Sequence, residues 1–425
     1  MRTIFTHAYL FDGTNAGVPD ATIVVSGDRI EAVHTTGTVN SGPEDVVYDL
    51  AGRSVLPGLG TGHFHGDSIF TDMSDIRNVY FGSERPAGVL MAAAINSCRN
   101  LLESGHTMAV GAACAHDIDA CVKMAVAEGL MDGPHLLACN QHVETTASEN
   151  DRAKWWYHQG NTGLSCLVDG PDEVRKAIRG QVARGTDIIK LYPTGGHGLV
   201  EDNTRRYLTR DELRTAVDTA HDLGKKVRAH AAWGHMIREC IEVGVDVIDH
   251  GDEIDESMIE LMLEKGTYWC PSARLIEMIL SFPSDDDGID DGFKGGVAGD
   301  WNNLCRMVPI GNDAGVNIIP GDDYGIMPIM PHTPGIYANE FVTYTERMGV
   351  KPLDVIRWAT ANVARLMGRQ GELGTVAPGA MADLIVVNGD PTSDIGLLRD
   401  PGTNLAAVMK GGRFFKSRLE TAASS

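Results

Sequence analysis

The sequence is short of the features that place a chain in a membrane or on a nucleic acid. No apolar run approaches the roughly 20 residues that a helix needs to cross a bilayer, and residues 1–7 lack the apolar core of a signal peptide. Lys and Arg number 36 against 58 Asp and Glu, a formal net charge of −22, and an acidic surface repels nucleic acid and anionic lipid. We therefore expect a cytoplasmic protein with neither a nucleic-acid nor a membrane partner.

Paired cysteines and a nucleotide-binding glycine motif are also missing. The eight cysteines are single and widely spaced, so reduced core thiols are expected rather than a disulfide framework or a zinc ribbon. No Gly-x-Gly-x-x-Gly follows the first strand of the central region, which argues against an open, doubly wound dinucleotide fold. With 425 residues, 43% of them hydrophobic, the chain can form one large domain and a smaller one.

Both ends of the chain carry short runs rich in β-branched residues and separated by turn signals. At the N-terminal end they predict a small antiparallel sheet with strands at residues 3–10, 21–25, 29–34 and 46–50. The C-terminal end repeats the pattern at residues 382–388, 405–410 and 413–416. The simplest packing combines residues 1–52 and 369–425 into one β-sandwich domain built from both chain termini.

Between residues 53 and 368, short apolar strands alternate with stretches of helical periodicity. After an opening strand, further strands are predicted at residues 106–114, 135–140, 187–192, 226–232, 246–252, 267–272 and 317–323. Helices are predicted at residues 87–104, 118–129, 171–184, 209–223, 235–243 and 257–265. Eight β units with intervening helices favour an α/β fold in which a (β/α)₈ barrel is inserted into the terminal sandwich.

The stretch from Ser54 to Gly66 contains two histidines, His63 and His65, two residues apart on a predicted strand. Side chains at this spacing face the same way, so two imidazoles converge on one point. Neutral imidazole suits zinc and its neighbours, but two ligands do not hold a metal alone. The two histidines are either the first ligands of a metal site or a structural or chance pair without a metal. Ligands on later strands would favour the metal site.

Later strands carry polar residues near their ends. Lys190 lies in the apolar fourth strand, where a bare ammonium is costly to bury, so it is either paired with a carboxylate or part of a metal site. His230 and His250 end the fifth and sixth strands, and Asp323 ends the eighth. Barrel strands open on one face at their C-terminal ends. Six side chains lie at corresponding positions of their β units and are therefore predicted to meet in one metal centre: His63, His65, Lys190, His230, His250 and Asp323.

The motifs around these residues resemble the amidohydrolase superfamily. The closest resemblance is to its branch of imidazolonepropionase-like hydrolases, which includes metal-dependent Xaa-Pro dipeptidases and ochratoxin-type amidases. The resemblance covers nearly the whole chain and implies the barrel inserted in a terminal sandwich. The matching motifs are Leu56-Pro-Gly-Leu before His63-Phe-His65, Ile189-Lys-Leu-Tyr-Pro-Thr-Gly-Gly196, Val227-Arg-Ala-His230, Gly244-Val-Asp-Val-Ile-Asp-His-Gly251 and Leu373-Gly-Thr-Val-Ala-Pro-Gly-Ala-Met-Ala-Asp-Leu-Ile-Val-Val387.

The resemblance implies two divalent metal ions, with zinc as the first expectation. One ion would be held by His63, His65 and Asp323, and the other by the histidines of the fifth and sixth strands. Lys190, carbamylated by carbon dioxide, would bridge the two ions together with a hydroxide, because a carbamate pairs with cations that would repel a free ammonium. The hydroxide would attack the amide carbonyl, and Asp323 would pass its proton to the departing amine.

Two further residues match positions that the family uses to contact substrate, His142 after the third strand and Tyr192 after the lysine. The chain departs from the family's pattern at Thr61, where an acid is common, and at Asp322, where the family has threonine. The spacing favours Asp323 as the ligand, and Asp322 stays the alternative.

Other features of the sequence keep more than one interpretation. His197, His235 and His332 are expected to be ordinary packed histidines near the open face of the barrel. The segment Trp155-Trp156-Tyr157 forms either a wall of the pocket or a loop packed on the barrel. The acidic segment 284–292 is expected to be a solvated loop after the seventh strand, with a covering role for the site as the alternative.

The predicted function is that of a binuclear metal-dependent amidohydrolase. Its substrate would be a small-molecule amide such as a dipeptide, an N-acyl amino acid or an aryl amide. The alternative is a cyclic-amide hydrolase or deaminase with a single metal, against which Lys190 argues because such enzymes lack a lysine ligand on the fourth strand. A catalytically silent scaffold is disfavoured because all six ligand positions are filled. Family members are often oligomers, so we also expect a homo-oligomer.

Overall fold

The structure is a computed structural model of the chain. It describes residues 1–35, 39–68, 85–148, 151, 163–197, 204–281, 291–321, 323–324 and 332–422, with the side chains of 291–293 excepted.

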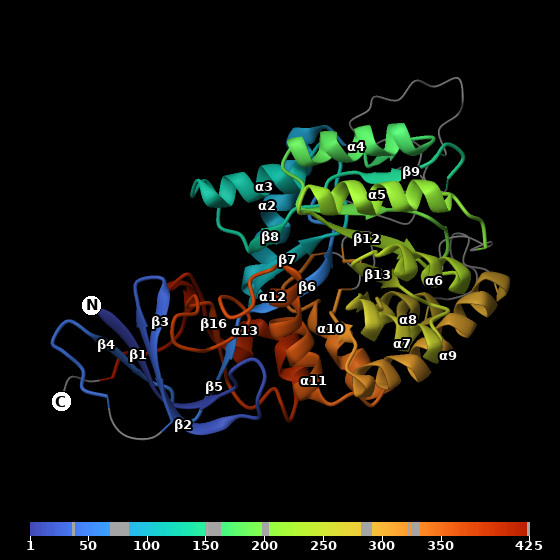
Figure 1. The fold of residues 1–425 in the computed structure, drawn as a ribbon. Helices are drawn as coiled ribbons and strands as arrows, with labels where there is room; N and C mark the ends of the chain where they lie inside the picture. The colour runs from blue at the N-terminus through green and yellow to red at the C-terminus, as the bar shows by residue number, and fades with distance from the viewer. Residues whose placement is uncertain are drawn as a thin grey trace.

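One eight-stranded sheet contains strands from both ends of the chain, seen at the left of Figure 1. Its strands follow the order β18-β17-β16-β5-β1-β2-β3, and β4 also pairs with β1. Their bounds are β1 Arg2–Leu10, β2 Val18–Ser26, β3 Arg29–His34, β4 Val46–Asp49, β5 Ser54–Pro57, β16 Leu384–Val387, β17 Leu405–Lys410 and β18 Arg413–Ser417.

The pairing of this terminal sheet is mixed, which differs in part from the expected antiparallel arrangement. Most neighbours are antiparallel, but β4 and β5 both run parallel to β1. They share one edge of β1, because β4 pairs with its first half and β5 with its last residues. The predicted domain boundary after residue 52 stays a prediction, although β5 lies beyond it and still pairs within the terminal sheet.

The second β structure is a parallel barrel. Its third strand is split, because β8 pairs with β7 while β9 pairs with β11. The barrel closes where the Gly62 N–H donates to the Pro320 carbonyl at 2.5 Å, so that β6 meets the end of the eighth strand. The bounds are β6 Leu59–Phe64, β7 His106–Gly111, β8 His135–Leu137, β9 His142–Glu144, β11 Ile188–Leu191, β12 Lys226–Ala231, β13 Val247–His250, β14 Tyr268–Cys270 and β15 Asn317–Ile318, with β10 Ser165–Leu167 added beside β9.

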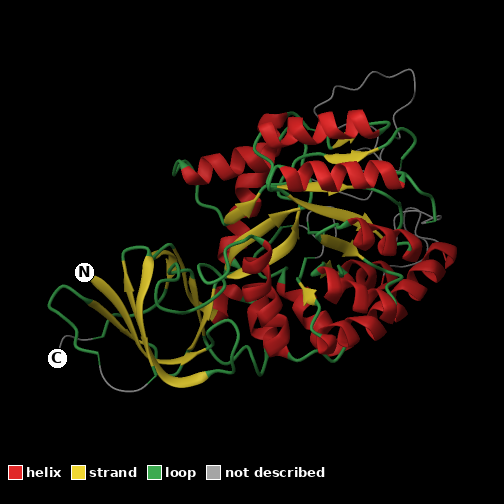
Figure 2. Cartoon of the chain, viewed as in Figure 1, coloured by secondary structure: helices red, strands yellow, loops and turns green. Residues whose placement is uncertain are grey.

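Helices surround the barrel on its outside (Figure 2). The predicted barrel and its terminal sheet are thus confirmed. Two helices between the seventh and eighth strands, α8 and α9, were not predicted, and the segment 282–290 between them lies outside the described residues. The helices are α2 Ala87–Glu103, α3 Ile118–Ala127, α4 Pro171–Ala183, α5 Arg210–Asp222, α6 Gly234–Val243, α7 Glu256–Lys265, α8 Ala273–Ser281, α9 Asp291–Ala314, α10 Ala338–Val342, η1 Thr343–Arg347, α11 Pro352–Arg357, η2 Trp358–Asn362, α12 Val363–Leu366, η3 Ile395–Arg399 and α13 Pro401–Asn404.

Helix α5 illustrates how the local sequence sets an element. Thr209 caps its first turn, because its hydroxyl accepts from the Glu212 N–H while the Glu212 carboxylate accepts from the Thr209 N–H. This reciprocal capping satisfies donors that a helix start leaves unpaired. Leu213 and Val217 recur at helical spacing and are buried against the barrel, so one face of the helix packs while the opposite face stays polar.

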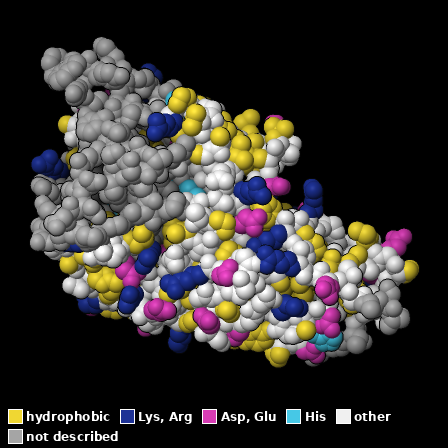
Figure 3. All heavy atoms as spheres, turned by 180° about the vertical axis from the view of Figure 1, so that it is seen from behind, with side chains coloured by type: hydrophobic (Ala, Val, Ile, Leu, Met, Phe, Trp, Pro, Cys, Tyr) yellow, Lys and Arg dark blue, Asp and Glu magenta, His cyan; other side chains and the backbone are white. Residues whose placement is uncertain are grey.

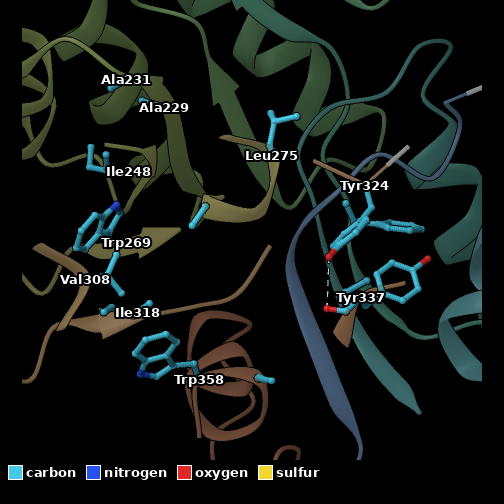
Figure 4. Close-up of a cluster of buried hydrophobic side chains, with 14 of the residues drawn as sticks. Ala229, Ala231, Ile248, Trp269, Leu275, Val308, Ile318, Tyr324, Tyr337 and Trp358 are labelled. Atoms are coloured by element: carbon cyan, nitrogen blue, oxygen red, sulfur yellow. Dashed lines mark hydrogen bonds between the residues drawn. The ribbon is translucent and has the colours of Figure 1, made fainter. Parts of the chain in front are cut away.

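The barrel strands bury both of their faces, as parallel strands do. Outward-facing Ile248 and Trp269 pack with Ile318 under the surrounding helices, where Figure 4 places them beside Val308 and Trp358. Inward-facing neighbours of the same strands, among them Val247, Tyr268 and Cys270, fill the barrel interior. Apolar side chains thus occupy both faces of these strands, and the polar side chains of the candidate site gather at the strand ends.

The outer surface carries mixed charge. On the face shown in Figure 3, basic and acidic side chains lie interspersed. Within the described part of the chain, no helix combines the length and the apolar character that crossing a membrane requires. The expected homo-oligomer stays a prediction.

Candidate metal centre

His63 and His65 lie at the end of the first barrel strand and are both buried. The His65 Nδ1–H donates to the Ala113 carbonyl at 2.9 Å, which fixes the tautomer and leaves a lone pair on Nε2. That Nε2 lies 3.3 Å from Oδ1 of Asp323, and Nε2 of His63 contacts the same oxygen. Two lone-pair acceptors facing each other at this distance call for a cation between them.

Asp323 reaches this point from the end of the eighth strand. Its backbone has φ 53°, a left-handed conformation that costs energy in a non-glycine residue and concentrates at functional sites. Ligand atoms of His63, His250 and Asp323 all lie within 4.8 Å of one another. Two ligand atoms about 2.1 Å from a tetrahedral ion lie roughly 3.4 Å apart, which matches the 3.3 Å between His65 Nε2 and Asp323 Oδ1. The residues therefore fit a divalent metal ion.

His230 and His250 approach from the neighbouring strands β12 and β13. Their rings lie 4.4 Å apart, and the His63 ring lies 5.4 Å from that of His250. Burial lowers the pKa of all three imidazoles, in His230 and His250 well below the ordinary value. Among the described residues, His63 Nδ1, His230 Nε2 and His250 Nδ1 have no hydrogen-bond partner. Neutral, buried imidazoles with an unsatisfied nitrogen are in the form that binds metal.

The Asp323 carboxyl is held in its charged form. Burial raises its pKa, but His63, His65 and His250 outweigh this effect and hold that pKa well below its usual range. A buried carboxylate needs a cation or strong donors. A metal ion bound between Asp323 and the imidazoles would supply this cation.

Lys190 lies in β11 and is buried, with its Nζ 2.5 Å from Oδ2 of Asp249. The structure thus shows the lysine paired with a carboxylate, which was one of the two interpretations left open by the sequence. The Lys190–Asp249 pair nevertheless adjoins the histidines of the candidate metal centre, because Asp249 Oδ1 lies 3.6 Å from Nδ1 of His63. Lys190 is therefore close to the predicted ligands.

Arg228 and Asp249 form a buried pair that the sequence analysis did not identify. The guanidinium donates to both oxygens of the Asp249 carboxylate, from Nε at 3.0 Å and from Nη2 at 2.5 Å. It also donates to the carbonyls of Gly62 and Gly111. Burial raises the pKa of Asp249, but Arg228 and Lys190 outweigh it and hold that pKa well below its usual range. The pair ties β12 to β13 and to the first two strands.

A second convergent group, formed by His63, Asp249 and Cys270, is a poorer metal site. Both Asp249 oxygens already accept hydrogen bonds from Arg228 or Lys190, and these cations would repel a metal ion. Burial also raises the pKa of the Cys270 thiol well above its ordinary value, which keeps it protonated. We therefore assign no ion to this group.

His142 and Tyr192 lie beside the cluster. The Tyr192 ring stacks on that of His230 with centroids 4.1 Å apart, and the His142 ring lies 5.1 Å from Tyr192 and 6.4 Å from His65. Both residues are buried, and burial lowers the pKa of His142 well below its ordinary value. The structure brings them to the predicted place, and their contact with substrate stays a prediction.

The other histidines divide into two groups. His332 is a packed histidine as expected, donating to the His65 carbonyl and contacting the Tyr337 hydroxyl. His197 is also buried and packed, with its ring stacked on that of His250 at 3.8 Å. His235 differs from the expectation, because it is exposed beside Glu239. Asp322 and the segment Trp155-Trp156-Tyr157 lie outside the described residues.

Glu340 of α10 is a further buried group near the site that the sequence did not indicate. Its Oε1 accepts from the Gly321 N–H at 2.9 Å and from the Tyr344 hydroxyl at 2.7 Å. Gly321 leads directly to the Asp322–Asp323 pair, so Glu340 fixes the backbone that carries the carboxylate ligand. The sequence offered only a weak signal, an acid between Asn339 and the apolar Phe341–Val342 end of a short helix.

Buried histidines and a carboxylate gather at the strand ends of this parallel barrel, which is the end where barrel enzymes have their active sites, and these residues could hold a metal ion. A family model described as the amidohydrolase family matches residues 54–414. The chain belongs to this family, and it is accordingly a hydrolase that acts on carbon–nitrogen bonds. The resemblance noted in the sequence is thereby confirmed.

Individual relatives narrow the comparison. Ochratoxinase of Aspergillus niger is 28% identical in an alignment 396 residues long that covers 85% of this chain and 75% of that protein. The crystal structure of a Xaa-Pro dipeptidase with bound methionine in its active site superposes with a TM-score of 0.86, at 26% identity over 98% of this chain and 100% of that one. A prolidase complexed with N-methylphosphonate-L-proline gives a TM-score of 0.85 at 25% identity, with the same coverage.

Proposed function

We propose that this amidohydrolase cleaves an amide carbon–nitrogen bond with two divalent metal ions held at the end of the barrel. The observation that carries the proposal is the convergence of buried histidines from three strands with Asp323 and Lys190 in one cluster. Relatives named for ochratoxin and for Xaa-Pro dipeptides support a substrate in which an amide joins an acyl group to an amino acid. A dipeptide, an N-acyl amino acid or an aryl amide fits this description.

The ligands divide between two positions. His63, His65 and Asp323 would hold the first ion, and His230 with His250 the second, with Lys190 between them. Zinc suits imidazole and carboxylate ligands in this number. When bound, the ions would lower the pKa of a water molecule and polarise the carbonyl of the substrate.

Lys190 would act as a carbamate. Its uncharged amine nitrogen bonds to the carbon of carbon dioxide and releases a proton, so that the side chain changes from a cation to an anion with two ligand oxygens. A buried anion between two cations is electrostatically favoured, whereas an ammonium at the same place is not. Asp249, which now accepts from the Lys190 ammonium, would keep its two bonds from Arg228.

Asp323 would transfer the proton. As the water oxygen bonds to the carbonyl carbon, its proton passes to the Asp323 carboxylate, which lies among His63, His65 and His250. The carbon–nitrogen bond then breaks and Asp323 delivers that proton to the leaving nitrogen, so that acid and amine products are balanced. His142 and Tyr192, beside the cluster, are proposed to contact the substrate.

Metal analysis separates this proposal from its alternative. About two divalent ions per chain in the active protein would support the binuclear hydrolase, and one ion per active chain would support the single-metal cyclic-amide hydrolase or deaminase. No bound ion after reconstitution would refute both. Turnover of N-acyl amino acids, dipeptides and lactams by the metal-loaded enzyme would then identify the substrate class.

The bridging role of Lys190 has its own test. Lys190→Ala should abolish turnover, and short carboxylic acids added with metal should restore part of it, because a small carboxylate can replace the carbamate. Lys226→Ala is the matched control, since Lys226 is partly exposed at the start of β12 and pairs only with Asp246 in the described structure. Unchanged metal content in Lys190→Ala, with no rescue, would refute the bridge.

A further inference from the structure

His197 and Asp252 form a fully buried pair behind the candidate metal centre. The His197 Nδ1 lies 2.9 Å from Oδ1 of Asp252, and neither side chain has any exposed surface. A buried carboxylate is costly unless it is paired, so Asp252 fixes which way the imidazole faces. His197 follows Gly196 and itself adopts φ 55°, a strained conformation that the surrounding structure must stabilise.

The face of the His197 ring lies against a predicted metal ligand. Its centroid is 3.8 Å from that of His250, with 26° between the ring planes, which is a stacked contact. The His250 ring also meets the His230 ring edge to face and lies 5.4 Å from the His63 ring. His250 is therefore packed between a second predicted ligand and a histidine to which no role has been assigned.

The pair is anchored from outside the barrel. Asp252 follows His250 by two residues, and Asn303 of α9 donates from Nδ2 to the carbonyls of Asp252 at 2.7 Å and Ile254 at 2.9 Å. The His250 carbonyl itself accepts from the Trp269 indole N–H at 2.7 Å. These bonds fix the backbone after β13, but they leave the rotation of the His250 ring to its packing neighbours.

We propose that His197, oriented by Asp252, is a positioning residue that holds the His250 imidazole in its metal-binding orientation. The inference rests on the proposed function, since it assigns His250 to the metal centre. His197 acts through His250 and not as a ligand, because it belongs to neither group of convergent ligand atoms found in the described residues. Partners that orient ligand side chains typically change metal affinity by about 10- to 100-fold when they are removed.

The test is a cobalt(II) titration of the metal-free full-length protein, followed by visible absorption, which reports both affinity and ligand geometry. His197→Ala should weaken one of the two binding events by about 10- to 100-fold and alter the absorption bands of that site. His197→Phe keeps a stacking ring, so it should recover most of the affinity that the alanine variant loses. Asp252→Asn should give an intermediate loss, because it keeps a hydrogen-bonding partner but removes the charge.

His235→Ala is the control, since His235 lies on the adjacent helix α6 and is largely exposed. It should titrate like the unsubstituted protein. Equal affinity and spectra in His197→Ala and the unsubstituted protein would overturn the positioning role while leaving the metal centre intact. A His197→Phe variant as weak as His197→Ala would also overturn it, because stacking would then not be the cause. Absence of cobalt binding by the unsubstituted protein would instead refute the metal centre, and the positioning role with it.

Discussion

Replacing Arg228 by methionine tests whether the buried pair with Asp249 supports both the barrel and the site. The guanidinium is completely buried and makes four hydrogen bonds, two to Asp249 and one each to the carbonyls of Gly62 and Gly111. Methionine has a similar length and fills the space with an apolar chain. It leaves Asp249 with Lys190 as its remaining cation and two strand carbonyls without their donor.

The expected cost follows from the burial. Removing one partner of a buried ion pair typically costs about 3–5 kcal/mol, because the remaining charge stays in a medium of low polarity. An exposed pair contributes about 0–1 kcal/mol. The exposed pair of Arg175 with Asp172 on α4 provides the comparison within the same chain. We therefore expect Arg228→Met to lower the free energy of unfolding by about 4 kcal/mol and Arg175→Met by less than about 1 kcal/mol.

Urea unfolding of the metal-free variants, followed by circular dichroism, measures this difference directly. Arg228→Lys should recover only part of the loss, because a single ammonium cannot donate in parallel to both oxygens of Asp249 and also reach both carbonyls. The metal content of Arg228→Met should fall as well, since Asp249 adjoins His63. A loss in Arg228→Met no larger than that in Arg175→Met would refute the reasoning.

Two further predictions concern stability. Burial lowers the pKa of the His106 imidazole from 6.5 to about 4. As the pH falls, this imidazole is therefore protonated in the unfolded chain before it is protonated in the folded one. The stability that its burial as a neutral ring contributes is complete above pH 6.5 and disappears toward pH 4. Each pKa unit corresponds to 1.36 kcal/mol, and glutamine does not titrate. Between pH 7 and pH 4.5, His106→Gln should therefore lose about 2 to 3 kcal/mol less of its free energy of unfolding than the unsubstituted protein, measured by urea unfolding. Identical losses in the two proteins would contradict this. Gly321→Ala should lower the thermal midpoint of unfolding, since the added methyl group would lie 2.3 Å from the His63 backbone nitrogen. Gly299→Ala in α9 is the control, because its methyl group would meet nothing within 4 Å. The control should leave the thermal midpoint unchanged or raise it, because alanine favours the helix more than glycine does.

The predictable part of the site is the part that barrel geometry determines. His63, His230, His250 and Asp323 each follow an apolar run short enough to be a strand, and parallel strands in a barrel must end on one face. Identifying the strands was therefore enough to bring these side chains together in the prediction. Lys190 was identified by a different argument, because an ammonium inside an apolar strand requires a partner wherever it lies.

The residues that were missed depend on contacts between strands and loops that the sequence does not encode locally. Arg228 and Asp249 are both visible as charges in strands, but their pairing depends on which residues of β12 and β13 lie side by side. His197 follows two glycines in a loop, where no periodicity indicates its direction. Helices α8 and α9 were not predicted, and in this connection the only expectation was a loop for the acidic segment 284–292.

The charges buried at the site give a reason for Lys190 to have two states. In the structure, Lys190 and Arg228 both pair with Asp249, and Asp323 is a further anion of the cluster, so the formal charges of these four side chains sum to zero. Binding of two divalent cations would add four positive charges to a region without solvent to screen them. Conversion of Lys190 to a carbamate removes one positive charge and adds one negative charge, which offsets half of that excess. The pairing with Asp249 and the proposed carbamate would therefore be compatible as two forms of Lys190, the first without and the second with bound metal ions.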